Sequence, residues 1–65
     1  MTREEIERLH QFASKMRRDL YRQTRLIESL PNKGELERAS ANALHRAADE
    51  IGVCVYQCEK AKQNL

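Results

Sequence analysis

The chain has 65 residues, of which 34% are charged and 40% hydrophobic, and it carries 12 Lys and Arg against 10 Asp and Glu. A chain of this size buries only about 60% of the surface that its unfolded form exposes, so a monomer would be marginally stable unless disulfides, a metal ion or a partner chain add stability. The longest apolar run, at 51–56, is far shorter than the ~20 residues that cross a bilayer, which excludes a membrane-spanning segment.

The first residues lack the apolar core and cleavage site of a secretory signal, so we expect the chain to stay in the reducing cytoplasm. Its two cysteines, Cys54 and Cys58, form neither a disulfide framework nor a Cys-x-x-Cys redox motif. We expect two reduced thiols in an apolar core, with no metal and no cofactor. The alternative is a zinc ion held by four thiolates from two chains.

A first helix is predicted at about 3–29. Thr2 and Glu5 have the spacing of a capping box, in which each side chain accepts a hydrogen bond from the other residue's backbone. Pro31, in the turn at 30–34, ends the helix because it disfavours helical backbone at the residue before it. Residues spaced alternately by three and four form a coiled-coil-like seam: Ile6, Leu9, Ala13, Met16, Leu20, Gln23, Ile27 and Leu30.

A second helix is predicted at about 35–62, with Asn32 or Gly34 as its N-cap. Glutamates in its first turn and lysines in its last match the helix dipole. Its apolar residues form two overlapping stripes, Ala41, Leu44, Ala48, Ile51, Val55, Cys58 and Leu44, Ala47, Ile51, Cys54, Cys58, Ala61. One neighbouring helix cannot cover so wide a face.

Two helices joined by a short loop predict an all-α antiparallel hairpin, with residues 1–65 as a single unit. One hairpin covers each helix on one side only, so we expect copies to associate, first as a homodimeric four-helix bundle and alternatively as a larger helical oligomer. The sequence also leaves open a monomer and a complex with a different protein. The expected oligomer core is Leu9, Met16, Leu20, Leu44, Ile51 and Cys58.

Positive charge is concentrated in the middle of the first helix. Residues 15–25 contain five Lys and Arg against one Asp, whereas the rest of the chain has seven basic and nine acidic residues. Two adjacent outward rows of the helix form a basic stripe, Arg8, Lys15, Arg18, Arg22 and Arg25. Because arginine binds phosphate in a planar, bidentate manner, we predict a phosphate-rich ligand at Lys15, Arg18, Arg22 and Arg25.

Tyr21 lies beside the basic stripe and is a candidate for stacking on a base, with packing at the core edge as its alternative role. A solvated helix face is the alternative for the stripe. His45 and Asp49 share a helix face, but no Ser or Cys nucleophile stands within one turn of them. Without a Gly-rich loop or a triad, we expect no enzyme activity.

The segment 44–51, Leu-His-Arg-Ala-Ala-Asp-Glu-Ile, resembles the Leu-His-x-x-Ala-Asp-Glu-Leu segment of Rop-type plasmid proteins, as do the opening Met-Thr-basic residues, the length and the seam. The resemblance implies a hairpin that dimerises into a four-helix bundle and binds paired RNA loops through helix 1 of both subunits. That family presents an outward Phe where this chain has Ser14, with Phe12 nearby. The residues at places comparable to its RNA-contacting positions are Arg3, His10, Arg18 and Arg25.

A second resemblance is to phage helical-hairpin sponges of the anti-CBASS and anti-Thoeris type, which sequester cyclic oligonucleotide signals of bacterial defence. It rests on Pro31, Glu35 and the Ala/Leu-rich second helix, which lacks the usual Trp. It implies ligands between subunits, with Arg and Lys on the phosphates and Tyr or Phe on the bases.

The expected function is therefore a non-enzymatic, homo-oligomeric hairpin that binds structured RNA through the basic stripe. The alternatives are a phage sponge for cyclic oligonucleotides and a protein–protein interaction module such as a small co-chaperone or inhibitor.

Overall fold

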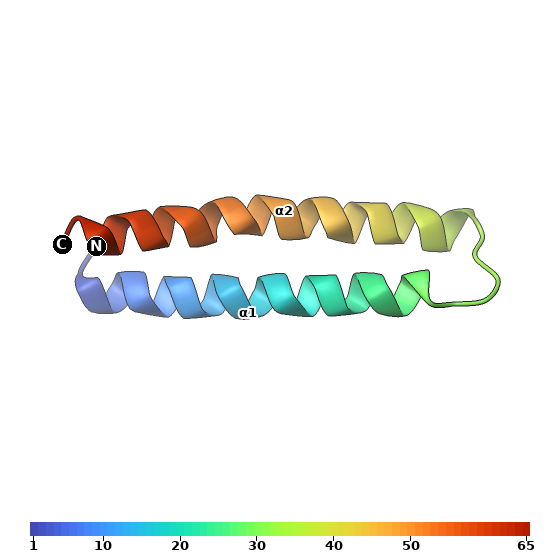
Figure 1. Cartoon of the computed structure of the whole chain (residues 1–65), viewed down its shortest axis with the longest axis horizontal. Coiled ribbons are helices and arrows are strands. Elements are labelled where there is room, and N and C mark those ends of the chain that lie inside the picture. The colour runs from blue at the N-terminus through green and yellow to red at the C-terminus, as the bar shows by residue number, and fades with distance from the viewer.

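The computed structural model describes all 65 residues, which form two long helices joined by a short turn (Figure 1). Helix α1 spans Arg3–Glu28 and helix α2 spans Glu35–Gln63. The helices lie side by side and antiparallel, with both termini at one end and the turn at the other (Figure 1). The prediction of an all-helical hairpin is confirmed, and each helix differs from its predicted range by one residue at its C-terminal end. Neither helix has an apolar stretch long enough to cross a membrane.

The helix starts are capped by the residues that the sequence indicates. The backbone N–H of Glu5 donates to the Thr2 hydroxyl at 3.2 Å, and the N–H of Thr2 donates to the Glu5 carboxylate at 2.8 Å. This second hydrogen bond lowers the pKa of Glu5 because it favours the ionised carboxylate. At α2 the N-cap is Gly34 rather than Asn32, and its N–H donates to the carboxylate of Glu37 at 3.2 Å.

The turn is held by side chains that reach exposed carbonyl groups. Lys33 Nζ donates to the carbonyl of Glu28, at the end of α1, at 2.7 Å. Arg38 Nη2 donates to the Lys33 carbonyl at 2.8 Å. The last carbonyls of a helix have no partner within the helix, so these bonds stabilise the point where the chain reverses.

The helices pack on one another through small side chains. Seven residues are buried, and Ile6 is the largest of them. The buried residues of α2 all belong to the first of its two predicted stripes, which α1 covers. They are Ala41, Ala48, Val55 and Cys58.

The surface of α1 that faces α2 includes one of the two rows of the predicted seam. Ile6, Ala13, Leu20 and Ile27 form a central row, and the first two are buried. The other half of the seam, which we call the apolar row, lies to one side. It consists of Leu9, Met16, Gln23 and Leu30, of which Leu9 is 37% and Leu30 45% exposed.

On the other side of the central row, His10, Arg17 and Thr24 form a polar row that packs against α2. Thr24 is buried and donates its hydroxyl to the Leu20 carbonyl at 2.8 Å. The predicted seam therefore has the central row in common with the packed surface, and only its second row lies on the other side from the row used within the chain. Polar side chains are tolerated there because Thr24 bonds to its own helix and longer side chains reach the edge of the interface.

This packing gives the hairpin two unlike long faces. On the apolar face, the apolar row of α1 lies beside Ala47, Cys54 and Ala61 of α2, and Leu9, Cys54 and Ala61 line one pocket of about 300 Å³ near the termini. On the polar face, the polar row lies beside polar residues and a glycine of α2. The residues that belong only to the second predicted stripe of α2, Ala47, Cys54 and Ala61, are thus exposed or half-buried in the hairpin.

Candidate phosphate-binding surface

All five side chains of the basic stripe are exposed, and they occupy helical positions outside the rows of α1 that pack against α2. Positions three, four and seven apart lie near one another on a helix surface, so the stripe is continuous. From Arg8 to Arg25 it runs about 25 Å along the helix axis, at ~1.5 Å per residue. The structure therefore places Lys15, Arg18, Arg22 and Arg25 on one surface.

Little negative charge neutralises this surface. Arg22 Nη2 lies 3.3 Å from Asp19 Oδ1, and the two side chains are 67% and 45% exposed. An exposed pair of this kind contributes only about 0–1 kcal/mol, so it is easily exchanged for another anion. Lys15, Arg18 and Arg25 have no salt bridge within the chain.

Tyr21 connects α1 to α2 on the polar face. Its hydroxyl donates to Asp49 Oδ1 at 3.1 Å, and its ring meets the His45 ring edge-on at a centroid distance of 5.8 Å. Arg17 Cζ lies 5.6 Å from the Tyr21 ring centroid. The His45–Asp49 pair, with 3.4 Å between Nδ1 and Oδ2, is part of the same contact. Stacking of Tyr21 on a base stays a prediction, and it requires a part of the ring that these neighbours leave open.

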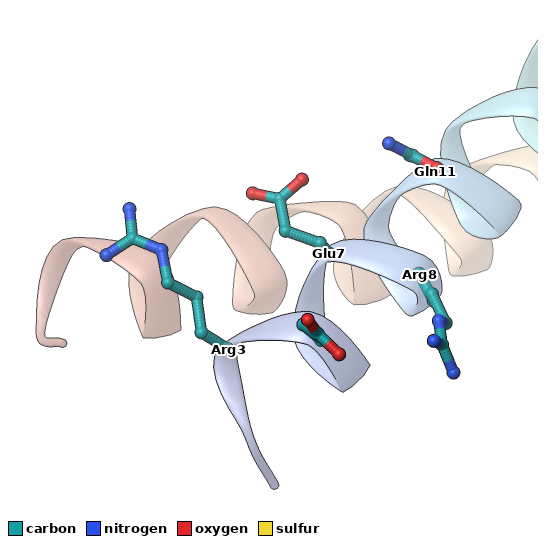
Figure 2. A pocket seen from close by; sticks show the side chains of 5 residues that line it. Arg3, Glu7, Arg8 and Gln11 are labelled. Carbon is teal, nitrogen blue, oxygen red and sulfur yellow. The ribbon is translucent and has the colours of Figure 1, made fainter.

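The first turns of α1 have mixed charge. Arg3, Glu4, Glu7, Arg8 and Gln11 line a surface hollow of about 500 Å³, and Figure 2 shows Arg3 and Glu7 projecting on one side of the helix and Arg8 on the other. Two carboxylates at this hollow oppose the binding of a polyanion. The part of the stripe that favours phosphate is therefore its middle and distal part.

A network of charged side chains occupies the end of the polar face near the termini. Lys62 Nζ lies 2.6 Å from His10 Nδ1 and 3.0 Å from Glu7 Oε1. The hydrogen bond from Lys62 lowers the pKa of Glu7 because it favours the carboxylate. His10 Nε2 lies 3.6 Å from Glu59 Oε1. Both ring nitrogens of His10 therefore face side chains of this chain.

The four positions comparable to RNA contacts in Rop-type proteins do not form one surface. Arg18 and Arg25 belong to the stripe, and both are exposed. Arg3 lies at the mixed-charge hollow, and His10 lies in the network above. Ser14, at the place of the family's outward Phe, is half-buried beside the polar row, whereas Phe12 is 62% exposed.

The cysteines lie at the boundary between the stripe of α2 that α1 covers and the side of α2 that belongs to the apolar face. Cys58 is buried and Cys54 is half-buried at the apolar face. Burial raises the pKa of the Cys58 thiol, and the neighbouring Cys54 raises it further. No three His, Cys, Asp or Glu side chains of the chain come together as metal ligands. A four-thiolate zinc site would need a second copy of the chain.

Sequence reasoning missed Arg17, which it counted only as one charge of a basic segment. Arg17 is half-buried against α2, and its Nε is enclosed without a hydrogen-bond partner. The signal that could have found it was its spacing of seven residues from both His10 and Thr24, which marks a polar row beside the seam.

The fold and this surface define the chain as a two-helix hairpin with an apolar face, a polar face and a basic outer edge. Comparison of the chain with family models, with curated proteins and with solved structures gives no match. The likenesses to Rop-type proteins and to phage sponges therefore rest on the sequence segments quoted above.

Proposed function

We propose that this chain is a homodimeric helical hairpin that binds structured RNA through the basic stripes of its two copies. The observation that carries the proposal is the stripe itself, five exposed cations along about 25 Å of helix with one paired carboxylate among them. The paired N–H donors of an arginine guanidinium match the spacing of phosphate oxygens. The choice of RNA among polyanions follows the resemblance to Rop-type hairpins.

The exposed area supports association. The hairpin exposes 5112 Å², whereas a compact monomer of this mass exposes about 4,300 Å². The excess, about 800 Å², equals the share of one partner in a standard protein–protein interface. The radius of gyration is 14.9 Å, against about 11 Å for a compact domain of this length.

The apolar face has the composition that such an interface needs. Leu9 and Met16 of α1 lie on the same side as Cys54 and Ala61 of α2, and the small residues allow a second hairpin to approach closely. Pairing these faces leaves the outer edge of α1 open in both copies. The dimer then presents two basic stripes to one ligand, which doubles the number of phosphate contacts.

The test is binding of a complex of two RNA hairpins with complementary loops, measured by fluorescence anisotropy at several salt concentrations. Arg18→Glu with Arg22→Glu should abolish binding while leaving helicity unchanged, because both side chains are exposed. The matched control, Arg46→Glu with Lys60→Glu, changes net charge equally on the exposed outer side of α2 and should bind nearly as the wild type does.

The affinity should also fall steeply with salt, since each neutralised phosphate releases counterions. Retained binding by the stripe variant, or equal loss in the control, contradicts the proposal. Tight, stoichiometric binding of a cyclic oligonucleotide with a raised melting temperature would identify a sponge instead. Absence of any nucleotide binding would favour a protein–protein interaction module.

A further inference from the structure

We infer that the polar face contains a binding site for a single phosphate group, formed between α1 and α2 around Arg17. A pocket of about 270 Å³ is lined there by Ser14, Arg17, Arg18, Tyr21 and Val55. Pockets for drug-sized ligands measure about 300–1,000 Å³, so this one fits a small group. Only the identity of the molecule that carries the phosphate rests on the proposed RNA-binding function.

Arg17 is a cation without an anion. It takes part in none of the four salt bridges of the chain, and its Nε has no hydrogen-bond acceptor. The nearby carboxylates of the polar face are engaged elsewhere, Asp49 with Tyr21 and His45, and Glu59 with His10. A partly desolvated guanidinium without a counter-ion is unfavourable, and an anion that reaches its terminal N–H groups from the pocket offsets part of that cost.

The guanidinium of Arg17 lies against α2 at Gly52. A Cβ atom at Gly52 would lie 3.4 Å from Arg17 Nε and 3.5 Å from its Cζ. Gly52 has no positive φ, so its backbone conformation does not require glycine. Glycine inside a helix costs about 1 kcal/mol relative to alanine. A Cβ at these distances would be in ordinary van der Waals contact, so the geometry shows that the Arg17 guanidinium lies directly against the α2 backbone at Gly52.

The pocket supplies donors and no carboxylate. Arg17 and Arg18 are successive guanidinium groups, and Ser14 adds a hydroxyl on the preceding turn. Two arginines and a hydroxyl match the several oxygens and the higher charge of a phosphate better than those of a carboxylate. Val55 forms an apolar wall, and a low local dielectric strengthens charge-assisted bonds.

The orientation of Arg17 is restrained before any ligand arrives. Its guanidinium lies over the Tyr21 ring, and that ring is tied to α2 through the hydrogen bond to Asp49. A positioned side chain loses less conformational entropy on binding than a free one does. The larger hollow in Figure 2 also has two arginines, but Glu4 and Glu7 line it and offset their charge.

Arg18 belongs both to this pocket and to the basic stripe. A phosphate in the pocket therefore continues the line of phosphate contacts from the outer edge of α1 onto the polar face. In the proposed dimer the polar face stays open, because the two copies meet through the opposite, apolar face. Each copy would then hold one phosphate in a defined place beside a looser row of exposed contacts.

The experiment is a titration of the ¹⁵N-labelled full chain with sodium phosphate, followed by NMR, against sodium chloride at matched ionic strength. The expected result is a saturable shift of the Arg17 Nε–Hε signal and of the Ser14 amide that chloride does not reproduce. Arg17→Met should weaken phosphate binding about tenfold or more, because a charge-assisted hydrogen bond is worth a factor of that order. Arg17→Lys should give an intermediate loss, because it keeps the charge and loses the fork.

Two further variants complete the test. Arg18→Met, at an exposed position that does not endanger folding, should weaken phosphate binding several-fold. Arg46→Met removes one positive charge from the outer side of α2 and should leave the phosphate affinity within twofold of the wild type. Shifts that grow linearly without saturation, that chloride reproduces, or that persist unchanged in both pocket variants would overturn the inference.

Titration with the RNA complex separates this inference from the proposed function. If phosphate saturates the pocket and no RNA binds, the site stands and the RNA proposal fails. If RNA binds through the stripe while Arg17→Met binds it as well as the wild type and phosphate never saturates, the site fails and the RNA proposal stands.

Discussion

A charge placed on the apolar face tests whether two hairpins meet there, and Leu9→Glu is the sharpest such change. In the isolated hairpin Leu9 is 37% exposed, so a glutamate at this position can reach water. In a dimer the same carboxylate would be enclosed by the apolar face of the second copy. A monomer and a dimer therefore predict very different free-energy costs for Leu9→Glu.

The size of the effect follows from the area. Two partners that each cover about 800 Å² bury the area of a standard interface, which supports affinities from micromolar to tighter. Burying an unpaired charge there costs several kcal/mol, and about 4 kcal/mol raises the dissociation constant roughly a thousandfold. In a monomer the change would cost only the apolar burial that Leu9 already has within the hairpin, about 1–2 kcal/mol of folding free energy, and it would leave the mass that of one chain.

The assay is the mass by light scattering together with thermal unfolding at several protein concentrations. The wild type should have the mass of two chains, and its melting temperature should rise with concentration, because dissociation accompanies unfolding. Leu9→Glu should move the chain to single copies at micromolar concentration. Val53→Glu, at a 55% exposed position on the outer side of α2, is the matched control and should remain dimeric. A wild type that melts cooperatively as a single copy, independently of concentration, would refute the reasoning.

Two further predictions concern stability. Gly52→Ala should raise the melting temperature by about 4–8 °C, because alanine gains about 1 kcal/mol in a helix interior and its Cβ would make ordinary van der Waals contact with the Arg17 guanidinium at 3.4 Å. Thermal unfolding followed by circular dichroism checks it, and a lower melting temperature would show that the close approach to α2 is essential for folding. The second concerns Glu7, whose pKa is lowered by Lys62 below its ordinary value of 4.5. Its stabilising contribution is present above that pH and is lost as the pH falls through the lowered pKa. Urea unfolding of the wild type and of Glu7→Gln should differ at pH 7, and the difference should shrink as the pH is lowered below 4.5; a difference that does not change with pH would contradict the assignment.

The elements of the fold were predictable because local signals specify them. The capping box at Thr2 and Glu5, the break at Pro31 and the cap at Gly34 each act within a few residues, and each is found in the structure or lies in the observed turn. The basic stripe was predictable for a similar reason, since the period of the helix alone decides which residues share an outer side. The sequence did not reveal the place of Arg17, because that depends on which side of α1 the second helix covers.

The sequence did not decide which side of α1 packs against α2, because one row of residues lies on each side of the central row at a similar angle. Apolarity favours the row of Leu9, Met16 and Leu30, whereas the hairpin packs the row of His10, Arg17 and Thr24 against α2. The two arrangements differ by a rotation of α1 of about 50°, half of the ~100° between successive helical residues. A local pattern shows which positions are apolar, but it does not show which neighbour covers them.

The observed rotation is itself an argument for association. A hairpin that acted alone would gain stability by turning α1 so that Leu9 and Met16 met α2 and Arg17 reached water, since burying apolar area is favourable and burying an unpaired charge is not. The structure instead leaves Leu9 37% and Leu30 45% exposed, and it encloses Nε of the half-buried Arg17 without a hydrogen-bond partner. This rotation of α1 has a low free energy if a second copy covers the exposed apolar row and an anion binds the Arg17 guanidinium. The proposed dimer would cover the exposed apolar row, and the proposed phosphate site would supply an anion to Arg17. The substitution Arg17→Met tests the two proposals separately. It should stabilise the hairpin, because a neutral side chain of similar length replaces an unpaired charge, and it should leave the dimer mass unchanged while phosphate binding is lost.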